Sequence, residues 1–485
     1  MLFLPIFVPP YGGGMEIIMA KSITREMTSG SPTKLILSFS IPMLIGNLFQ
    51  QFYNMVDSIV VGKFVNSDAL AAVGATGSLI FLIFGLTFGL SAGISIVISQ
   101  YFGAKDYENV RKGFVTAVYI VIGASLIMGT LGFLTSRWLL ELLNTPAEVI
   151  GMSDIYMKIS YAGILGIACY NGMAAVLRAL GDSITPLIFL IIASLLNVAL
   201  DLLFVIVFHW GVAGVAIATI ISQWISAIGC IIYAVAKVKL LRVPLKEFRP
   251  DKVIFKKCIR LGIPVALQNS FVSISMMVLQ GVINGFQETI MAAATVVNRI
   301  EQLVLQPGMS IGAAVASFTG QNIGAGKIDR VKKGMKSSTI IIVIFSLAML
   351  PILYFGGEYL MRLFTKKEDI EVVAYGVQGI RITSFFYTFV GMIFITRNFL
   401  SGSGDIQVPM VMGLTEVICR VSFSGILAAQ LGYKGIFWAT ALTWLITGII
   451  GSLRVISGKW KGKSVVSQLQ NTTYPQTENE AGQTE

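Results

Sequence analysis

Residues 183–236 read SITPLIFLIIASLLNVALDLLFVIVFHWGVAGVAIATIISQWISAIGCIIYAVA and contain a single charged side chain, Asp201. A membrane span takes about 20 apolar residues, so this stretch predicts two transmembrane helices, divided near His209 and Gly211. The whole chain of 485 residues is 55% hydrophobic and 13% charged, with a mean hydropathy of +0.78. Because a soluble domain carries about 25% charged residues, we predict an all-α integral membrane protein.

Charge-poor stretches mark the predicted spans along the rest of the chain. They lie near 35–56, 69–102, 114–136, 159–177, 183–208, 211–236, 261–287, 302–326, 337–357, 374–401, 406–430 and 435–453. The total of twelve suits helices, because barrel strands would be about 10 residues of alternating polarity.

Lys and Arg gather in alternate loops, with nine in residues 237–260 and five in residues 327–336. The positive-inside rule then places both termini in the cytoplasm, and we expect a multi-pass protein of the cell membrane. These loops also account for the net charge of +11, so no nucleic-acid partner is predicted.

The two halves of the chain share motifs in the same order. SIPMLIGN at 40–47 matches GIPVALQN at 262–269, and GDSITP at 181–186 matches GDIQVP at 404–409. Two more pairs are 98–113 with 318–334 and 211–219 with 432–440. Six spans in each half predict two six-helix bundles related by a pseudo-twofold axis along the membrane normal, a geometry suited to alternating access.

The expected divisions follow from this repeat. They are a mobile leader at 1–33 (whose first 18 residues are of uncertain origin), an N-terminal bundle at 34–236, a basic linker at 237–260, a C-terminal bundle at 261–456 and a cytoplasmic tail at 457–485.

Two isolated carboxylates lie at the end of, or within, predicted spans of the first half. Asp57 is the only charge in residues 35–62, and Asp201 the only one in 183–236. Each costs about 2.5–3.5 kcal/mol or more in the membrane interior, so a function is expected of both. Asn197 precedes Asp201 by four residues and shares its helix face, and Thr219 adds a hydroxyl from the next span. This oxygen-only set predicts a site for Na⁺ or H⁺.

Burial disfavours a charged carboxylate and a bound cation favours it, so such a pair can exchange an inorganic ion for a cationic substrate. The four cysteines and one histidine form no zinc, haem or iron–sulfur pattern. We therefore expect no cofactor besides the coupling ion, no enzymatic activity, small organic cations as partners, and a monomer in the lipid bilayer.

Aromatic and amide side chains predict a substrate cavity, with core packing as the alternative for each. They are Gln50, Gln51, Tyr53, Asn54, Tyr161, Gln268, Phe385 and Tyr387. The second half carries other charges in its predicted spans. Glu416 and Arg420 lie four residues apart and are predicted to pair along one helix, whereas the roles of Glu301 and Arg381 stay open.

The motifs quoted above, with RALGDSITP at 178–186 and NVALD at 197–201, resemble the multidrug and toxic compound extrusion (MATE) transporters over residues 33–456. The resemblance implies twelve helices in two lobes and cation-coupled drug efflux. In the DinF-like branch, the cation site matches Asp57, Asn197, Asp201 and Thr219. The NorM-like branch also has acidic residues on helices seven and ten, which this chain lacks.

Two other functions remain open from the sequence. A flippase for lipid-linked oligosaccharides, in the same superfamily, would need several basic residues in the cavity, and only Arg381 and Lys158 are candidates. A membrane prenyltransferase would need paired Asp clusters for Mg²⁺, and NVALD holds one Asp.

Overall fold

The computed structural model describes residues 24–143 and 145–466, which form helices joined by loops, with no strand within those ranges. Ten described helices are long and apolar enough to cross a membrane, and two bent pairs each complete one further span. The single spans are α1 (Pro32–Phe64), α2 (Ser67–Gly103), α3 (Tyr107–Leu142), α6 (Ile184–Leu202), α7 (Gly211–Lys237), α8 (Lys252–Ile283), α9 (Glu288–Gly324), α10 (Ile328–Arg362), α13 (Gln407–Leu431) and α14 (Lys434–Ile456).

The bent pairs occupy corresponding places in the two halves of the chain. In the first half α4 (Ala147–Ala162) meets α5 (Ile164–Ala179) at 47°, and in the second half α11 (Ile370–Ser384) meets α12 (Tyr387–Ser403) at 54°. Counting each pair once, the predicted twelve spans are confirmed.

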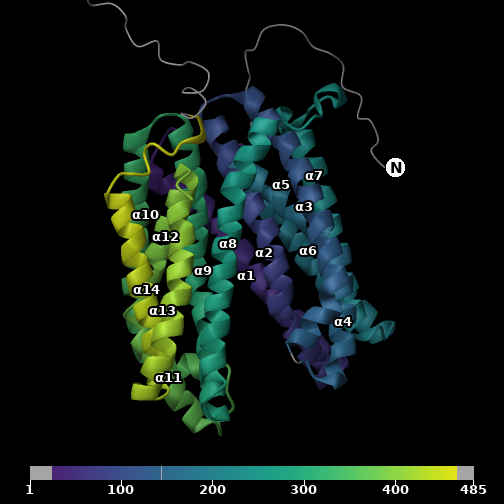
Figure 1. Ribbon diagram of the computed structural model, residues 1–485, viewed down its shortest axis with the longest axis vertical. Coiled ribbons are helices and arrows are strands. Elements are labelled where there is room, and N and C mark those ends of the chain that lie inside the picture. The colour runs from purple at the N-terminus through teal and green to yellow at the C-terminus, as the bar shows by residue number, and fades with distance from the viewer. Residues whose placement is uncertain (1–23, 144, 467–485) are drawn as a thin grey trace, which may run out of the picture.

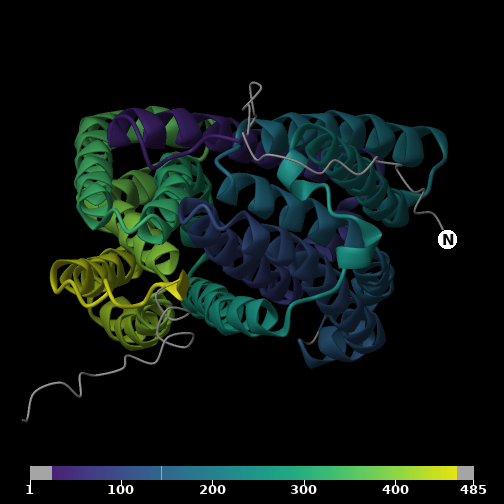
Figure 2. The same cartoon turned by 90° about the horizontal axis from the view of Figure 1, so that it is seen from above.

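The helices form two bundles that stand side by side, α1–α7 and α8–α14 (Figures 1 and 2). They touch near the end of the molecule where the described chain begins and ends, and they diverge toward the end that holds α4 and α11 (Figure 1). The predicted all-α architecture of two six-span bundles is therefore confirmed.

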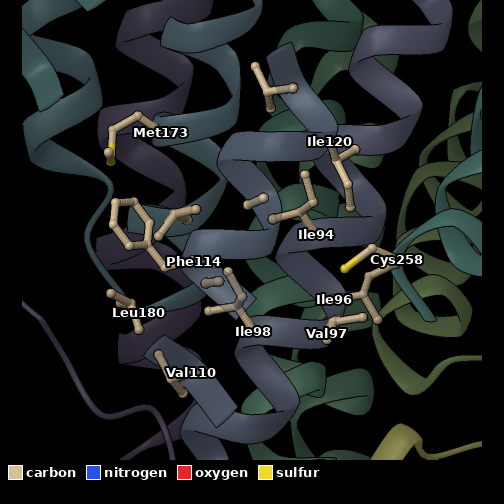
Figure 3. Close-up of a cluster of buried hydrophobic side chains, with 14 of the residues drawn as sticks. Ile94, Ile96, Val97, Ile98, Val110, Phe114, Ile120, Met173, Leu180 and Cys258 are labelled. Carbon is tan, nitrogen blue, oxygen red and sulfur yellow. The ribbon is translucent and has the colours of Figure 1, made fainter. Parts of the chain in front are cut away.

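The first helix of each bundle begins against the other bundle. The start of α1 contributes Leu35, Ile36 and Phe39 to a core cluster with Ile311 and Phe318 of α9, whereas its last turns pack Val60 and Val61 within the N-terminal bundle. In the same way, α8 begins against α2 and α3. Its Cys258 lies beside Ile94, Ile96 and Val97 in Figure 3, and its Leu279 and Ile283 pack within the C-terminal bundle.

Small residues allow α2 and α8 to approach closely. The run FGLTFGLSAG at 84–93 repeats glycine every fourth residue, a spacing that lets helix backbones touch in membranes. A Cβ added at Gly89 would lie 2.4 Å from the backbone nitrogen of Ala266, and one at Gly93 would lie 2.6 Å from the carbonyl oxygen of Cys258. Larger side chains at either position would force the bundles apart.

The segments at both ends of the described residues pack where the bundles meet. Residues 24–31 run ahead of α1, and the side chain of Met27 is 1% exposed. Residues 457–466 follow α14, and their Trp460 and Val465 are buried. The expected leader at 1–33 thus includes a packed segment from residue 24 onward, while residues 1–23 and 467–485 lie outside the described residues. Likewise α8 begins at Lys252, inside the predicted linker.

Candidate functional site

The face of α6 that points into the N-terminal bundle carries the polar residues. Its buried stripe includes Ser194, Asn197 and Asp201, and its exposed face presents Ile188 and Leu195. The apolar face of α6 is the one available to lipid and its polar face is buried, which is the reverse of an amphipathic helix on a soluble protein. A π-helical turn at Leu203–Val207 follows directly, a distortion that is common at functional sites.

Asp57 of α1 and Asp201 of α6 come together in the interior of the N-terminal bundle. Their side chains are electrostatic neighbours. Asp201 has no exposed surface, and Asp57 is partly buried. Among the described residues, no N–H or O–H donor reaches the buried Oδ1 of Asp57 or either oxygen of Asp201. Buried carboxyl oxygens are normally satisfied, so this arrangement leaves positions for a bound ion or proton.

Asn197 and Thr219 extend the same polar cluster. Nδ2 of Asn197 donates to Oγ1 of Thr219 over 3.3 Å, and the Thr219 hydroxyl donates to the carbonyl of Val215 at 3.0 Å. Oδ1 of Asn197 is buried and accepts no hydrogen bond from the described residues. The amide therefore directs its donor toward α7 and keeps its acceptor free. A small cavity between α1, α6 and α7 is lined by Tyr53, Ala193, Ser194, Asn197, Thr219, Ser222 and Gln223.

Two tyrosines complete the surroundings of the acids. Tyr53, one helical turn before Asp57, was expected in the substrate cavity and lies close to both Asp57 and Asp201. Tyr156 of α4 lies near enough to the same two acids to interact with them electrostatically, and it was not among the predicted site residues. Its only sequence signal is an aromatic hydroxyl in a predicted loop, because the helix α4 begins twelve residues before the span expected at 159–177.

The remaining predicted cavity residues separate into buried and accessible groups. Gln50, Asn54 and Phe385 are exposed, Gln51 is intermediate, and Tyr161, Gln268 and Tyr387 are buried. Tyr161 packs in a core cluster with Leu140 and Met157, so in this state it belongs to the bundle interior rather than to a cavity surface. Tyr387 likewise faces Glu301 inside the C-terminal bundle.

The predicted pairing of Glu416 with Arg420 is wrong. Glu416 forms its ion pair with Arg397 of α12, a buried residue that was not among the predicted membrane charges. Arg420 instead donates from Nη1 to Oγ1 of Thr440 at 3.4 Å. A pair four residues apart on one helix contributes only about 0.2–0.5 kcal/mol, so the packing of α13 against its neighbours decides the partners.

The comparisons agree with this architecture. A model of the MatE family matches the chain twice, over residues 42–203 and 264–426. The chain is 31% identical over 446 residues to the probable multidrug resistance protein YpnP of Bacillus subtilis (strain 168), covering 91% of this chain and 99% of the relative. It is also 26% identical over 473 residues to the probable multidrug resistance protein YoeA of the same strain, covering 94% and 100%.

A solved structure superimposes on most of the chain. It is described as the outward-facing conformation of a multidrug resistance MATE family transporter of the MOP superfamily, with a TM-score of 0.82 and 26% identity, and the match covers 90% of this chain and 98% of that one. The family model matches each bundle separately, in line with the internal repeat. This chain therefore belongs to the MatE family of multi-span membrane transporters.

Proposed function

We propose that the protein is a secondary active multidrug efflux transporter that exports organic cations in exchange for Na⁺ or H⁺. The carboxyls of Asp57 and Asp201 are the exchange point, with Asn197 and Thr219 as neutral ligands. The family supports multidrug efflux, since its relatives YpnP and YoeA are described as probable multidrug resistance proteins. The ligand set supports a place in the DinF-like branch.

The observation that carries the proposal is the pair of adjacent acids without donors. Two carboxylates side by side repel each other, and their removal from water adds to the cost. A proton shared between them, or a Na⁺ held by their oxygens, removes that cost. A cationic substrate in the same region would compete for the same negative charge, so binding of one favours release of the other.

The shape of the molecule supports alternating access. Contacts between the bundles lie toward the end that carries the packed segments 24–31 and 457–466, and the bundles diverge at the other end. With the termini in the cytoplasm, as the loop charges predict, this arrangement is closed to the cytoplasm. The acids then lie on the route between the divergent end and the closed end, where an ion can arrive from outside.

Transport of an ethidium-type dye tests the proposal. Proteoliposomes are given a Na⁺ gradient alone, a pH gradient alone, or no gradient, and movement of the dye across the membrane is followed by fluorescence. We expect one gradient to drive transport, and we expect Asp57→Asn and Asp201→Asn to abolish the gradient-driven component. Asp68→Asn is the matched control, because Asp68 is an exposed acid in the first turn of α2. Normal transport in both site variants would refute the mechanism.

The flippase alternative gains no support from the basic residues it would need. Lys158 pairs with Asp154 at 2.7 Å on its own helix. Arg381 donates from Nε to the carbonyl of Tyr354 at 3.2 Å and lies over the ring of that tyrosine. Both cations are thus engaged locally, whereas recognition of a diphosphate needs several free donors that converge.

A further inference from the structure

The C-terminal bundle contains a counterpart of the Asn197–Thr219 contact. The GDSITP and GDIQVP motifs begin at 181 and 404, a shift of 223 residues, which aligns Asn197 with Arg420. The motifs at 211 and 432 differ by 221 residues, which aligns Thr219 with Thr440. The bond from Asn197 Nδ2 to Thr219 Oγ1 is 3.3 Å, and that from Arg420 Nη1 to Thr440 Oγ1 is 3.4 Å.

The two counterpart sites differ in charge. In the N-terminal bundle the charged neighbour of each acid is the other acid. In the C-terminal bundle Arg420 is only 1% exposed, and its acidic neighbours are Glu416 and Glu301. Glu416 is also held by Arg397. With all four groups ionised, the C-terminal set of two arginines and two glutamates therefore has a formal charge of zero without any bound ion.

Glu301 of α9 is an electrostatic neighbour of Arg420 but forms no direct ion pair among the described residues. It is 8% exposed, and its Oε1 accepts no hydrogen bond from the described residues. Thr383 and Tyr387 supply neutral oxygen groups beside it. Without the guanidinium, this acid and these hydroxyls would form an oxygen-lined site of the same kind as the one around Asp57.

We infer that Arg420, at the position that Asn197 holds in the N-terminal bundle, is a built-in cation that takes the place of a bound ion beside Glu301, so that only the N-terminal bundle exchanges ions. The inference rests on the proposed role of Asp57 and Asp201. A tethered guanidinium balances Glu301 permanently, because an arginine keeps its charge at every physiological pH. Arg420 thereby sets the number of ions moved per cycle, and its removal is expected to open a second monovalent-cation site at Glu301 and Thr440.

Ion binding to purified protein in nanodiscs tests this directly. The probes are ²²Na⁺, measured by equilibrium binding, and protons, measured by potentiometric titration of the same samples. In a D57N/D201N background, where the N-terminal site is removed, we expect Arg420→Asn to add one bound ion or proton per chain. Adding Glu301→Gln is expected to remove it again. Arg420→Lys keeps a fixed cation and should add none, and Arg381→Asn is a control for loss of an exposed arginine.

The outcomes separate the two proposals. If D57N/D201N binds as many ions as the wild type, the proposed N-terminal site is refuted. The inference about Arg420 is tested by a separate comparison, between D57N/D201N with and without R420N. If R420N in that background binds no additional Na⁺ and takes up no additional proton, the inference about Arg420 is wrong. Should R420N be too unstable to purify, thermal stability decides: R420N/E301Q must recover stability relative to R420N, and failure to recover also overturns the inference.

Discussion

Gln100 of α2 and Gln321 of α9 form reciprocal hydrogen bonds across the interface between the bundles. Nε2 of Gln100 donates to the carbonyl of Gly402 in the C-terminal bundle, and Nε2 of Gln321 donates to the carbonyl of Ala179 in the N-terminal bundle, both at 3.0 Å. The two amide oxygens accept from opposite ends of the chain. Gln321 receives the backbone N–H of Met27 at 2.8 Å, and Gln100 receives that of Val465 at 2.7 Å.

These reciprocal bonds lie where backbone contacts close one end of the transporter. A Cβ at Gly103 would lie 1.8 Å from the carbonyl oxygen of Gln321, and one at Gly324 would lie 1.8 Å from that of Gln100. Only glycine fits where two backbones meet so closely, which explains the paired glycines of the repeated motifs.

Gly103→Ala and Gly324→Ala are expected to open this end. Overpacking of this kind costs about 1–3 kcal/mol, which would lower the closed population by about tenfold for each 1.4 kcal/mol. Spin labels at the exposed positions Arg111 and Lys333, in a background without the four native cysteines, report the distance between bundles. We expect longer distances in both variants. Gly123→Ala is the control, because nothing lies within 4 Å of its added Cβ.

The packed segment 24–31 is predicted to depend on one arginine. Arg330 donates to the carbonyls of Met27, Ser29 and Gly30, so Arg330→Ala removes the main side chain that holds these backbone groups. Hydrogen exchange of amides 24–31 should accelerate at least tenfold, while amides 457–466 keep their rates. Lys332→Ala should change neither segment, since Lys332 is an exposed residue paired with Asp329. Equal acceleration in both variants would contradict the assignment.

Asn197→Leu and Thr219→Val are predicted to weaken binding of the coupling ion without abolishing transport. Each removes one neutral polar group, and a hydrogen bond to a charged group is worth about 1.5–3 kcal/mol. The half-saturating ion concentration for dye transport should therefore rise by about tenfold or more. Thr219→Ser retains the hydroxyl and should stay near the wild-type value. An unchanged ion dependence in Asn197→Leu would exclude its amide from the site.

The ion pair between Arg397 and Glu416 provides a stability test within the membrane domain. Arg397→Met leaves Glu416 buried without its partner, and breaking a buried pair in this way costs about 3–5 kcal/mol. Arg397→Met combined with Glu416→Gln should recover most of that loss. Thermal unfolding in detergent, followed by a thiol-reactive dye on the free cysteines, measures both. A double variant no more stable than Arg397→Met alone would show that the pair is not the source of the effect.

The twelve spans, the repeat and the two isolated acids could all be predicted from the sequence. Membrane insertion assigns a cost to each side chain separately, so a lone Asp57 or Asp201 is conspicuous before its neighbours are known. Helical periodicity also places Asn197 and Asp201 on one face of the same helix. Both kinds of evidence depend on residues that are close in the chain.

Contacts between helices were decided only by the tertiary structure. Periodicity shows which face of a helix is polar but not which helix it meets. Residue spacing therefore could not predict that Asp57 lies near Asp201, that Tyr156 lies near both, or that Glu416 pairs with Arg397. The packing of residues 24–31 and 457–466 depends likewise on the buried side-chain amides of Gln100 and Gln321, which acquire their partners only when the two bundles meet.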